Sequence, residues 1–389
     1  MRSVLKVAIL TVVGLGSLSA CGGSSFSGAA SGTGGASNTG GASSTGPTLD
    51  QVPQYYAEGA CAALNRCNQA MASIMLGSND CTSLVANQAI NASLPGMQAA
   101  VAAGTVTYAP SVLSDCKAAV DAAGCSVSDN PYMVACESAL TGTVDEGGAC
   151  SIDEECKGDL YCKYSGNCPG TCTQREAEGA LCRADKNCQS GLTCLASSDS
   201  SGKCAVKPKL GEECGYDLPG TCATQSSGAG VVCWGASSSK RGKCVAIDAI
   251  ASQAIGSDCS VPTGSLCVAG ASCQIATLLL TGTCVASVAS GTSCTLAFPD
   301  PCPSDQYCTA TGATAPGNCE LLPLDGKPCA TALVAVFSNK VCAAAHVCVS
   351  GTCIKLRANG ATCTSNAVCY SGRCDSQSQL CVPNQNCGP

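Results

Sequence analysis

Aromatic side chains and histidine are scarce in this chain. Phe, Trp and Tyr together make up 3% of the 389 residues, and His346 is the single histidine. A chain so poor in large side chains cannot build a sizeable apolar core, so other links have to hold its fold together. A Ser-His-Asp or Cys-His catalytic site would have to be built around His346, which we interpret as incidental.

Metal-binding signatures are also missing from the sequence. No two cysteines stand at the CxxC spacing of zinc fingers, and neither an EF-hand loop nor a calcium-binding nonapeptide repeat is present. We therefore expect no metal and no cofactor.

Positive charge is sparse as well. The chain has 20 Lys and Arg residues against 27 Asp and Glu residues, a formal net charge of -7. A nucleic-acid partner would require a basic stripe, so we exclude one. The short basic run of Lys240, Arg241 and Lys243 is interpreted as a solubilising loop, with contact to anionic lipid or polysaccharide as the alternative.

The N-terminal segment has the form of an export signal. A basic start with Arg2 and Lys6 precedes an apolar run over residues 7–18, and small residues follow before Cys21. An apolar run of about a dozen residues is shorter than the roughly 20 that a transmembrane helix needs. Residues 1–20 are therefore predicted to be a signal peptide.

Residues 18–21, Leu-Ser-Ala-Cys, resemble a bacterial lipoprotein box. The resemblance implies that the chain is cut before Cys21 and that the Cys21 thiol is acylated, for example with palmitate. Gly22 stands where an aspartate commonly retains such proteins at the inner membrane, so the resemblance favours the outer membrane, with the periplasmic face or the cell surface left open. Cleavage would remove Arg2 and Lys6 and change the net charge from -7 to -9.

Two further regions precede the most informative part of the chain. Residues 21–47 are the acylated Cys21 and a stretch of Gly, Ser, Ala and Thr, which is predicted to be a flexible tether with a reach of roughly 25 to 30 Å. Residues 48–142 carry apolar residues three and four apart, which predicts a small helical domain with one helix over Pro110–Ala123. Its six cysteines leave the pairing open, and they are Cys61, Cys67, Cys81, Cys116, Cys125 and Cys136.

Residues 143–389 contain seven tandem units, each opening with a glycine three residues before a cysteine. The opening cysteines are Cys150, Cys182, Cys214, Cys259, Cys294, Cys329 and Cys363. Six units also have a glycine two residues before their last cysteine, and we expect positive φ at these recurring glycines. With Cys21 set aside, 36 of the 37 cysteines remain, an even number that allows complete pairing.

Each unit is predicted to be one or two short β-hairpins with little regular structure, held by two disulfides. In the first two units the structural disulfide cysteines are Cys150, Cys156, Cys162, Cys172, Cys182, Cys188, Cys194 and Cys204. The pairing is left open, and Cys168 and Cys387 stand outside the pattern of four cysteines per unit. The expected fold class is thus a series of small disulfide-rich repeats after a disulfide-linked α-helical domain.

The motif of Gly179, Cys182, Cys188, Gly191, Leu192, Cys194, Gly202 and Cys204 resembles the Dickkopf N-terminal cysteine-rich domain as it recurs in bacterial, particularly myxobacterial-type, lipoproteins. Gly158, Leu160 and Cys162 occupy matching places in the first unit. The resemblance covers residues 147–204 well and the later units loosely. It implies an envelope protein, and the signalling role of the animal domains is not carried over.

Acidic clusters are the remaining candidates for chemistry. They comprise Asp145 and Glu146, Asp153 to Glu155, and Glu212 and Glu213. Paired carboxylates act as acid and base where a cleft shifts one pKa. Here they lie in loops beside cysteines, so we expect solvated faces.

Together these features predict a lipid-anchored envelope protein that is not an enzyme. Its modules would project from the membrane and present loops for binding or adhesion to an extracellular or periplasmic protein or a polysaccharide. The alternatives are a secreted hydrolase or hydrolase inhibitor, with the helical domain as the active part, and a purely mechanical spacer.

Overall fold

The computed structural model describes residues 46–123, 139–164, 169–182, 187–196, 202–223, 231–236, 240–246, 249–261, 263–276, 280–312, 315–332, 335–336 and 338–383. These residues form a small helical region followed by many short antiparallel strand pairs that are linked by disulfides. The expected disulfide-bonded, cysteine-rich repeats are confirmed at this level.

The described part of the helical region has a 3-10 helix, four α-helices and a two-stranded sheet. Its elements are η2 (Leu49–Gln51), α2 (Val52–Leu76), α3 (Cys81–Ala92), α4 (Leu94–Ala103), β1 (Val106–Tyr108), α5 (Pro110–Ala123) and β2 (Leu140–Gly142). The Cys61–Cys81 disulfide joins α2 to the start of α3. The predicted helix over Pro110–Ala123 is confirmed as α5.

Local signals explain where these helices begin and end. The Asp80 carboxylate accepts a hydrogen bond from the Ser83 amide at 2.7 Å and caps α3. Gly104 ends α4 in the left-handed conformation, with φ of 74°. The chain then turns into β1, which pairs with β2.

Five of the seven units contain a three-stranded antiparallel arrangement in which the last strand lies in the middle. In chain order the strands are β3 (Ala149–Cys150), β4 (Leu160–Lys163), β5 (Gly170–Gln174), β6 (Leu181–Cys182), β7 (Leu192–Ala196), β8 (Gly202–Val206), β9 (Glu213–Cys214), β10 (Val231–Trp234), β11 (Gly242–Ala246), β12 (Asp258–Ser260), β13 (Ala271–Ile275), β14 (Thr281–Ala286), β15 (Ser293–Cys294), β17 (Gln306–Cys308) and β18 (Gly317–Leu321). Strand β16 (Ala297–Phe298) extends the sheet of the fourth unit by pairing with β13.

The last two units are more open. The sixth has one hairpin, β19 (His346–Val349) and β20 (Thr352–Lys355), and the seventh has isolated bridges and the 3-10 turn η7 (Asn366–Val368). A similar turn, η4 (Asp153–Glu155), lies in the first unit.

Every unit pairs its first cysteine with its third and its second with its fourth. The first-to-third bonds are Cys150–Cys162, Cys182–Cys194, Cys214–Cys233, Cys259–Cys273, Cys294–Cys308, Cys329–Cys348 and Cys363–Cys374. The second-to-fourth bonds are Cys156–Cys172, Cys188–Cys204, Cys222–Cys244, Cys267–Cys284, Cys302–Cys319, Cys342–Cys353 and Cys369–Cys381. The two bonds interlock, so neither half of a unit can leave without breaking one.

The recurring glycines meet two different demands. All seven opening glycines have positive φ, as expected, and Gly256 has the largest value at 89°. The expectation is wrong for most closing glycines that the structure describes: at Gly170, Gly242, Gly282 and Gly317 no positive φ occurs, and an added Cβ would meet a backbone or sulfur atom within 3 Å instead. Close strand packing therefore explains these positions.

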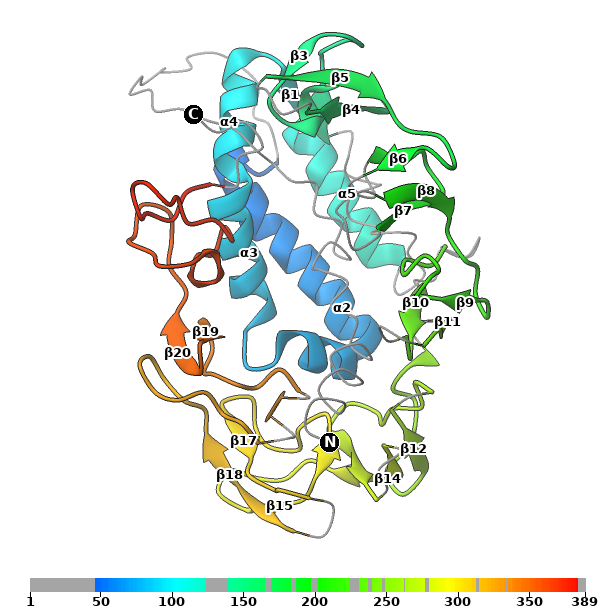
Figure 1. Cartoon of the computed structure of the whole chain (residues 1–389), viewed down its shortest axis with the longest axis vertical. Coiled ribbons are helices and arrows are strands. Elements are labelled where there is room, and N and C mark those ends of the chain that lie inside the picture. Colours follow the sequence, from blue (N-terminus) through cyan, green and yellow to red (C-terminus); the bar gives the residue numbers. More distant parts are fainter. Residues whose placement is uncertain are drawn as a thin grey trace.

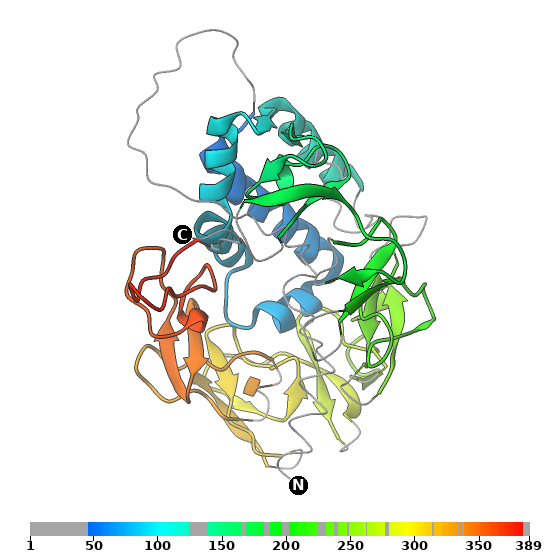
Figure 2. The same ribbon diagram turned by 45° about the horizontal axis from the view of Figure 1, so that its top comes forward.

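The units form an arc around the helices, as Figures 1 and 2 both show. Ile152 of the first unit packs with Met97 and Ala100 of α4. At the other end, Asn359 of the seventh unit bonds to Asn91 of α3. The series of units therefore curves back on itself, because both of its ends attach to the same helical region.

Candidate functional site

The fifth and sixth units meet at a buried pair of opposite charges. Asp300 lies two residues before the second cysteine of the fifth unit, and Lys340 lies two residues before the second cysteine of the sixth. The Lys340 Nζ atom is 3.7 Å from Asp300 Oδ1, and the two side chains are 7% and 0% exposed. Burying charges so completely carries a large desolvation penalty, which makes this junction a candidate site.

Backbone groups of the fifth unit hold both side chains. Asp300 Oδ1 accepts the Cys302 amide at 2.9 Å, and Asp300 Oδ2 accepts the Cys308 amide at 3.0 Å. Lys340 Nζ donates to the Cys302 carbonyl at 2.7 Å and to the Pro303 carbonyl at 2.9 Å. The lysine is therefore bonded more closely to neutral carbonyls than to the carboxylate.

The fifth unit lacks one backbone hydrogen bond that the other six units have. In the other six units, the residue after the second cysteine donates its amide to a carbonyl in the segment before the unit, as Lys157 does to Val144 and Tyr370 to Arg357. In the fifth unit that residue is Pro303, which has no N–H. The Pro303 carbonyl accepts the Gln306 amide of its own unit at 3.0 Å and also Lys340 Nζ of the sixth unit at 2.9 Å.

Burial shifts both groups of the pair toward their neutral forms. Desolvation raises the pKa of the Asp300 carboxyl, although the charge of Lys340 opposes this. Desolvation lowers the pKa of the Lys340 amine, although the charges of Asp300 and Asp305 oppose that shift. The neutral acid and the neutral amine therefore cost less free energy to form here than on a protein surface.

A hollow of about 220 Å³ borders the pair. It is lined by parts of the fourth, fifth and sixth units and by Gly77, between α2 and α3. Ser272 lines it too, is 1% exposed, and its Oγ has no hydrogen-bond partner among the described residues. The lining includes polar side chains such as Asp300, Ser338 and Lys340, and the hollow is large enough for several water molecules.

Sequence reasoning missed this site. The sequence holds two local signals. The first is that Asp300 lies between Pro299 and Pro301, in a unit whose second cysteine is itself followed by proline. The other is the 12-residue spacing of Cys329 and Cys342, which is longer than the five residues of the first two units. Neither signal says that the two segments meet.

His346 lies at the start of β19, where its side chain is half-buried and its Nδ1 is 2.7 Å from the Ala344 carbonyl. The structure does not bring it together with the acidic clusters by any described hydrogen bond. Its contact with a carbonyl is the ordinary satisfaction of an imidazole nitrogen.

The expectation of solvated acidic clusters is wrong for Glu155. This residue is 7% exposed, and its carboxylate accepts hydrogen bonds from the amides of Ser151 and Ile152 and from the Thr105 hydroxyl. Because Thr105 belongs to the helical region, Glu155 joins that region to the first unit. Amide and hydroxyl donors replace the water that the carboxylate loses on burial.

The other predicted charges also form local contacts. Asp145 pairs with Lys157, and Glu146 accepts from Gln174. Arg241, from the short basic run, lies 2.8 Å from Glu213 and 2.7 Å from Asp217. These exposed pairs contribute little stability but neutralise much of the run.

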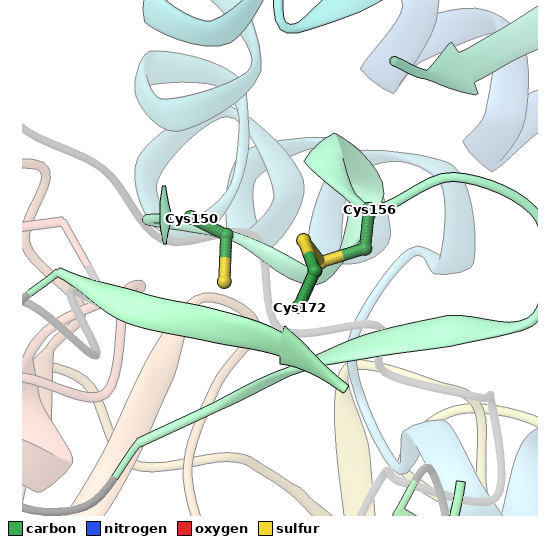
Figure 3. Close-up of side chains that lie close together, drawn as sticks. All are labelled: Cys150, Cys156 and Cys172. Carbon is green, nitrogen blue, oxygen red and sulfur yellow. A yellow bond between two sulfur atoms is a disulfide. The ribbon is translucent and has the colours of Figure 1, made fainter. Parts of the chain in front are cut away.

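Cysteine sulfur atoms gather closely enough to suggest metal sites. In the first five units the first, second and fourth cysteines place their sulfur atoms within 4.8 Å of one another, as Cys150, Cys156 and Cys172 do. Figure 3 shows that Cys156 and Cys172 are joined, with Cys150 beside them. The crossing of two disulfides explains the proximity, and a sulfur in a disulfide is not a thiolate ligand.

Some predicted features lie outside the described residues. These are the signal peptide, Cys21, most of the tether, Cys125, Cys136, Cys168 and Cys387. Among the described residues, no helix is both long and apolar enough to cross a membrane.

Comparisons with known families, curated proteins and solved structures return no match to this chain. The resemblance to the Dickkopf cysteine-rich domain therefore stays a prediction based on the spacing of its glycines and cysteines.

Proposed function

We propose that this chain is a lipid-anchored protein of the bacterial cell envelope, whose disulfide-linked units present surfaces for binding or adhesion. The observation that carries the proposal is the complete pairing of the four cysteines in each of the seven units. Such bonds form and persist outside the cytosol. Together with the export signal and the lipoprotein-box resemblance at Cys21, they favour an exported and anchored protein.

Exposed apolar side chains support a binding role. Val206 and Leu321 are 55% and 71% exposed, and each stands two residues after the last cysteine of its unit. Leu181 and Leu324 are also exposed. Val206 and Leu321 occupy equivalent positions of the second and fifth units, and repeat proteins build extended binding surfaces from such positions on rigid units. We propose an extracellular or periplasmic protein or a polysaccharide as the partner.

Structural contacts of the candidate catalytic groups favour binding over hydrolysis. Glu155 holds backbone amides, Arg241 holds Glu213, and His346 faces a carbonyl. Each group thus makes a structural contact within the fold. The hydrolase alternative would gain support if a soluble fragment turned over peptide, ester or glycan substrates and lost this activity on substitution of His346.

The test uses the full chain in a bacterial host, as wild type and as Cys21→Ala. The wild-type chain should incorporate labelled palmitate, begin at Cys21 and remain with the outer membrane, because the acylated thiol is the anchor. Cys21→Ala should lose the label and leave the membrane, whereas the control Ser24→Ala should behave as wild type. A wild-type chain that still begins with Met1, or that contains many free thiols, would contradict the proposal.

The released Cys21→Ala chain then serves as the binding probe for isolated outer membranes and their polysaccharide. Adding Val206→Ser and Leu321→Ser should weaken binding several-fold, because apolar anchors dominate most interfaces. Exchanging the exposed Lys203 for serine is the matched control. Equal binding by all three chains would place the binding surface elsewhere and contradict this assignment.

A further inference from the structure

We propose that Asp300 and Lys340 condense into an intramolecular amide bond that joins the fifth and sixth units, since the two side chains are buried together and Lys340 Nζ lies 3.7 Å from Asp300 Oδ1. This modification is independent of the proposed binding role. It would add one covalent link of a second kind to a fold that already depends on disulfides.

The surroundings of Lys340 suit a nucleophilic amine. A deprotonated amine has two N–H bonds and one lone pair, and desolvation is a known way to expose that lone pair for reaction. The carbonyls of Cys302 and Pro303 accept two hydrogen bonds from Nζ, at 2.7 and 2.9 Å. Asp300 is the third neighbour of Nζ, so the lone pair of the neutral amine is left to face the carboxyl group.

The surroundings of Asp300 suit an electrophile. Each carboxyl oxygen accepts a backbone amide, one from Cys302 and one from Cys308. Such preorganised donors stabilise negative charge that develops on oxygen during attack at a carbonyl carbon. Burial, which raises the pKa of this carboxyl and lowers the pKa of the amine, favours the two neutral forms that have to react.

The distance also argues against an ordinary ion pair. Charge-assisted N–H to carboxylate bonds are about 2.7 to 2.9 Å long, whereas here Nζ and Oδ1 are 3.7 Å apart. The amine has to reach the Asp300 Cγ carbon, which carries Oδ1, and reacting atoms in a near-attack arrangement are about 3 to 3.5 Å apart. Because Nζ already lies 3.7 Å from Oδ1, a small movement of Lys340 would bring the amine to that carbon.

The reaction balances without any other reagent. The Nζ lone pair attacks the Asp300 Cγ carbon, a C–N bond forms, and the carbonyl π electrons move onto the oxygen held by a backbone amide. A proton passes from nitrogen to the hydroxyl oxygen, the C–O bond breaks, and water leaves as the carbonyl forms again. The hollow beside the pair has room for this water.

The test is peptide mapping of the full mature chain, after free thiols have been shown to be absent and the disulfides have then been reduced. The chain is cut with trypsin and with a protease that cleaves after Glu320, which lies between the two residues. We expect one joined peptide that contains both Asp300 and Lys340, is lighter than its two parts by one water, and is uncut after Lys340.

Two variants make the result specific. Lys340→Arg keeps the positive charge but should lose the joined peptide entirely. Asp300→Asn should lose ammonia in place of water and give the same joined peptide as the wild type, because the amide product is identical. Recovery of separate, unmodified peptides from a wild-type chain without free thiols would overturn the proposal and leave a buried ion pair.

Discussion

Single residues in the repeats are fixed by backbone geometry more than by side-chain chemistry. The opening glycine of the fourth unit, Gly256, has φ of 89° and open space where a Cβ would be. The closing glycine, Gly282, has ordinary φ, but its Cβ would lie 1.7 Å from the Gln274 carbonyl oxygen. Gly256 is therefore needed for its positive φ, whereas Gly282 is needed because there is no room for a side chain.

This difference predicts unequal effects of alanine at the two glycines. Gly256→Ala should destabilise by about 1 to 2 kcal/mol, the usual penalty for a left-handed residue with a side chain. Gly282→Ala should cost more, toward or above the upper end of about 1 to 3 kcal/mol, because the hairpin has to open to admit the methyl group. Thermal unfolding with disulfides intact measures both, and equal shifts would contradict the distinction.

For single residues, the sequence shows which positions are fixed in every unit but not always why. Fixed offsets from cysteines identify the opening and closing glycines, yet both groups look alike in the sequence. The pairing of Asp300 with Lys340 could not be predicted from the sequence for another reason. Their burial depends on two units meeting in space, and no spacing rule connects residues in different units.

At the scale of elements, the units differ in how much core they share. The second unit has its own small cluster, built from its cysteines and Leu192. The fourth unit belongs to a larger cluster that runs from Trp234 of the third unit to Cys319 of the fifth. Strand β16 adds to this continuity because it leaves the fifth unit to pair with β13 of the fourth.

Removing one disulfide should therefore have a local effect in the second unit and a wider effect in the fourth. Cys182→Ser with Cys194→Ser opens a bond of sequence separation 12, and Cys259→Ser with Cys273→Ser opens one of 14, so the lost chain constraint is similar, about 3 kcal/mol. Without the Cys182–Cys194 bond, hydrogen exchange should become faster only in the second unit. Without the Cys259–Cys273 bond, it should become faster in the fourth unit and also in the fifth. If removal of the Cys259–Cys273 bond makes exchange faster in the fourth unit alone, the shared cluster does not couple the fourth and fifth units.

The strand pairs were predictable from the repeats, whereas the pairing of cysteines was not. Four cysteines allow three pairings, and spacing alone does not choose among them. The third and fourth cysteines lie directly opposite each other on one hairpin, as Cys162 and Cys172 do, yet they bond to different partners. Each bond ties the hairpin back to the first half of its unit, which only the folded structure reveals.

At the scale of the whole molecule, the two ends of the arc attach to the helices in different ways. The first unit uses Ile152, which is 1% exposed and packs in an apolar cluster with Met97. The seventh unit uses hydrogen bonds, from the Asn359 amide to Asn91 Oδ1 at 2.8 Å and from Asn359 Nδ2 to the Asn91 carbonyl at 2.7 Å. The contact between Asn91 and Asn359 joins residues 268 positions apart, so the sequence could not predict the arc.

Asn91 should therefore control whether the arc closes. Asn91→Ala leaves the partly buried Asn359 amide without its acceptor. The cost, about 1 to 3 kcal/mol, falls on the contact between α3 and the segment that opens the seventh unit. We expect faster hydrogen exchange over residues 357–383 and a larger radius of gyration in X-ray scattering, with the first unit unchanged. Asn87→Ala is the matched control, because the Asn87 side chain bonds to the Ser83 carbonyl of its own helix. If Asn91→Ala behaves like this control, other contacts, such as those of Ser78 and Asn79 with the sixth unit, hold the arc closed.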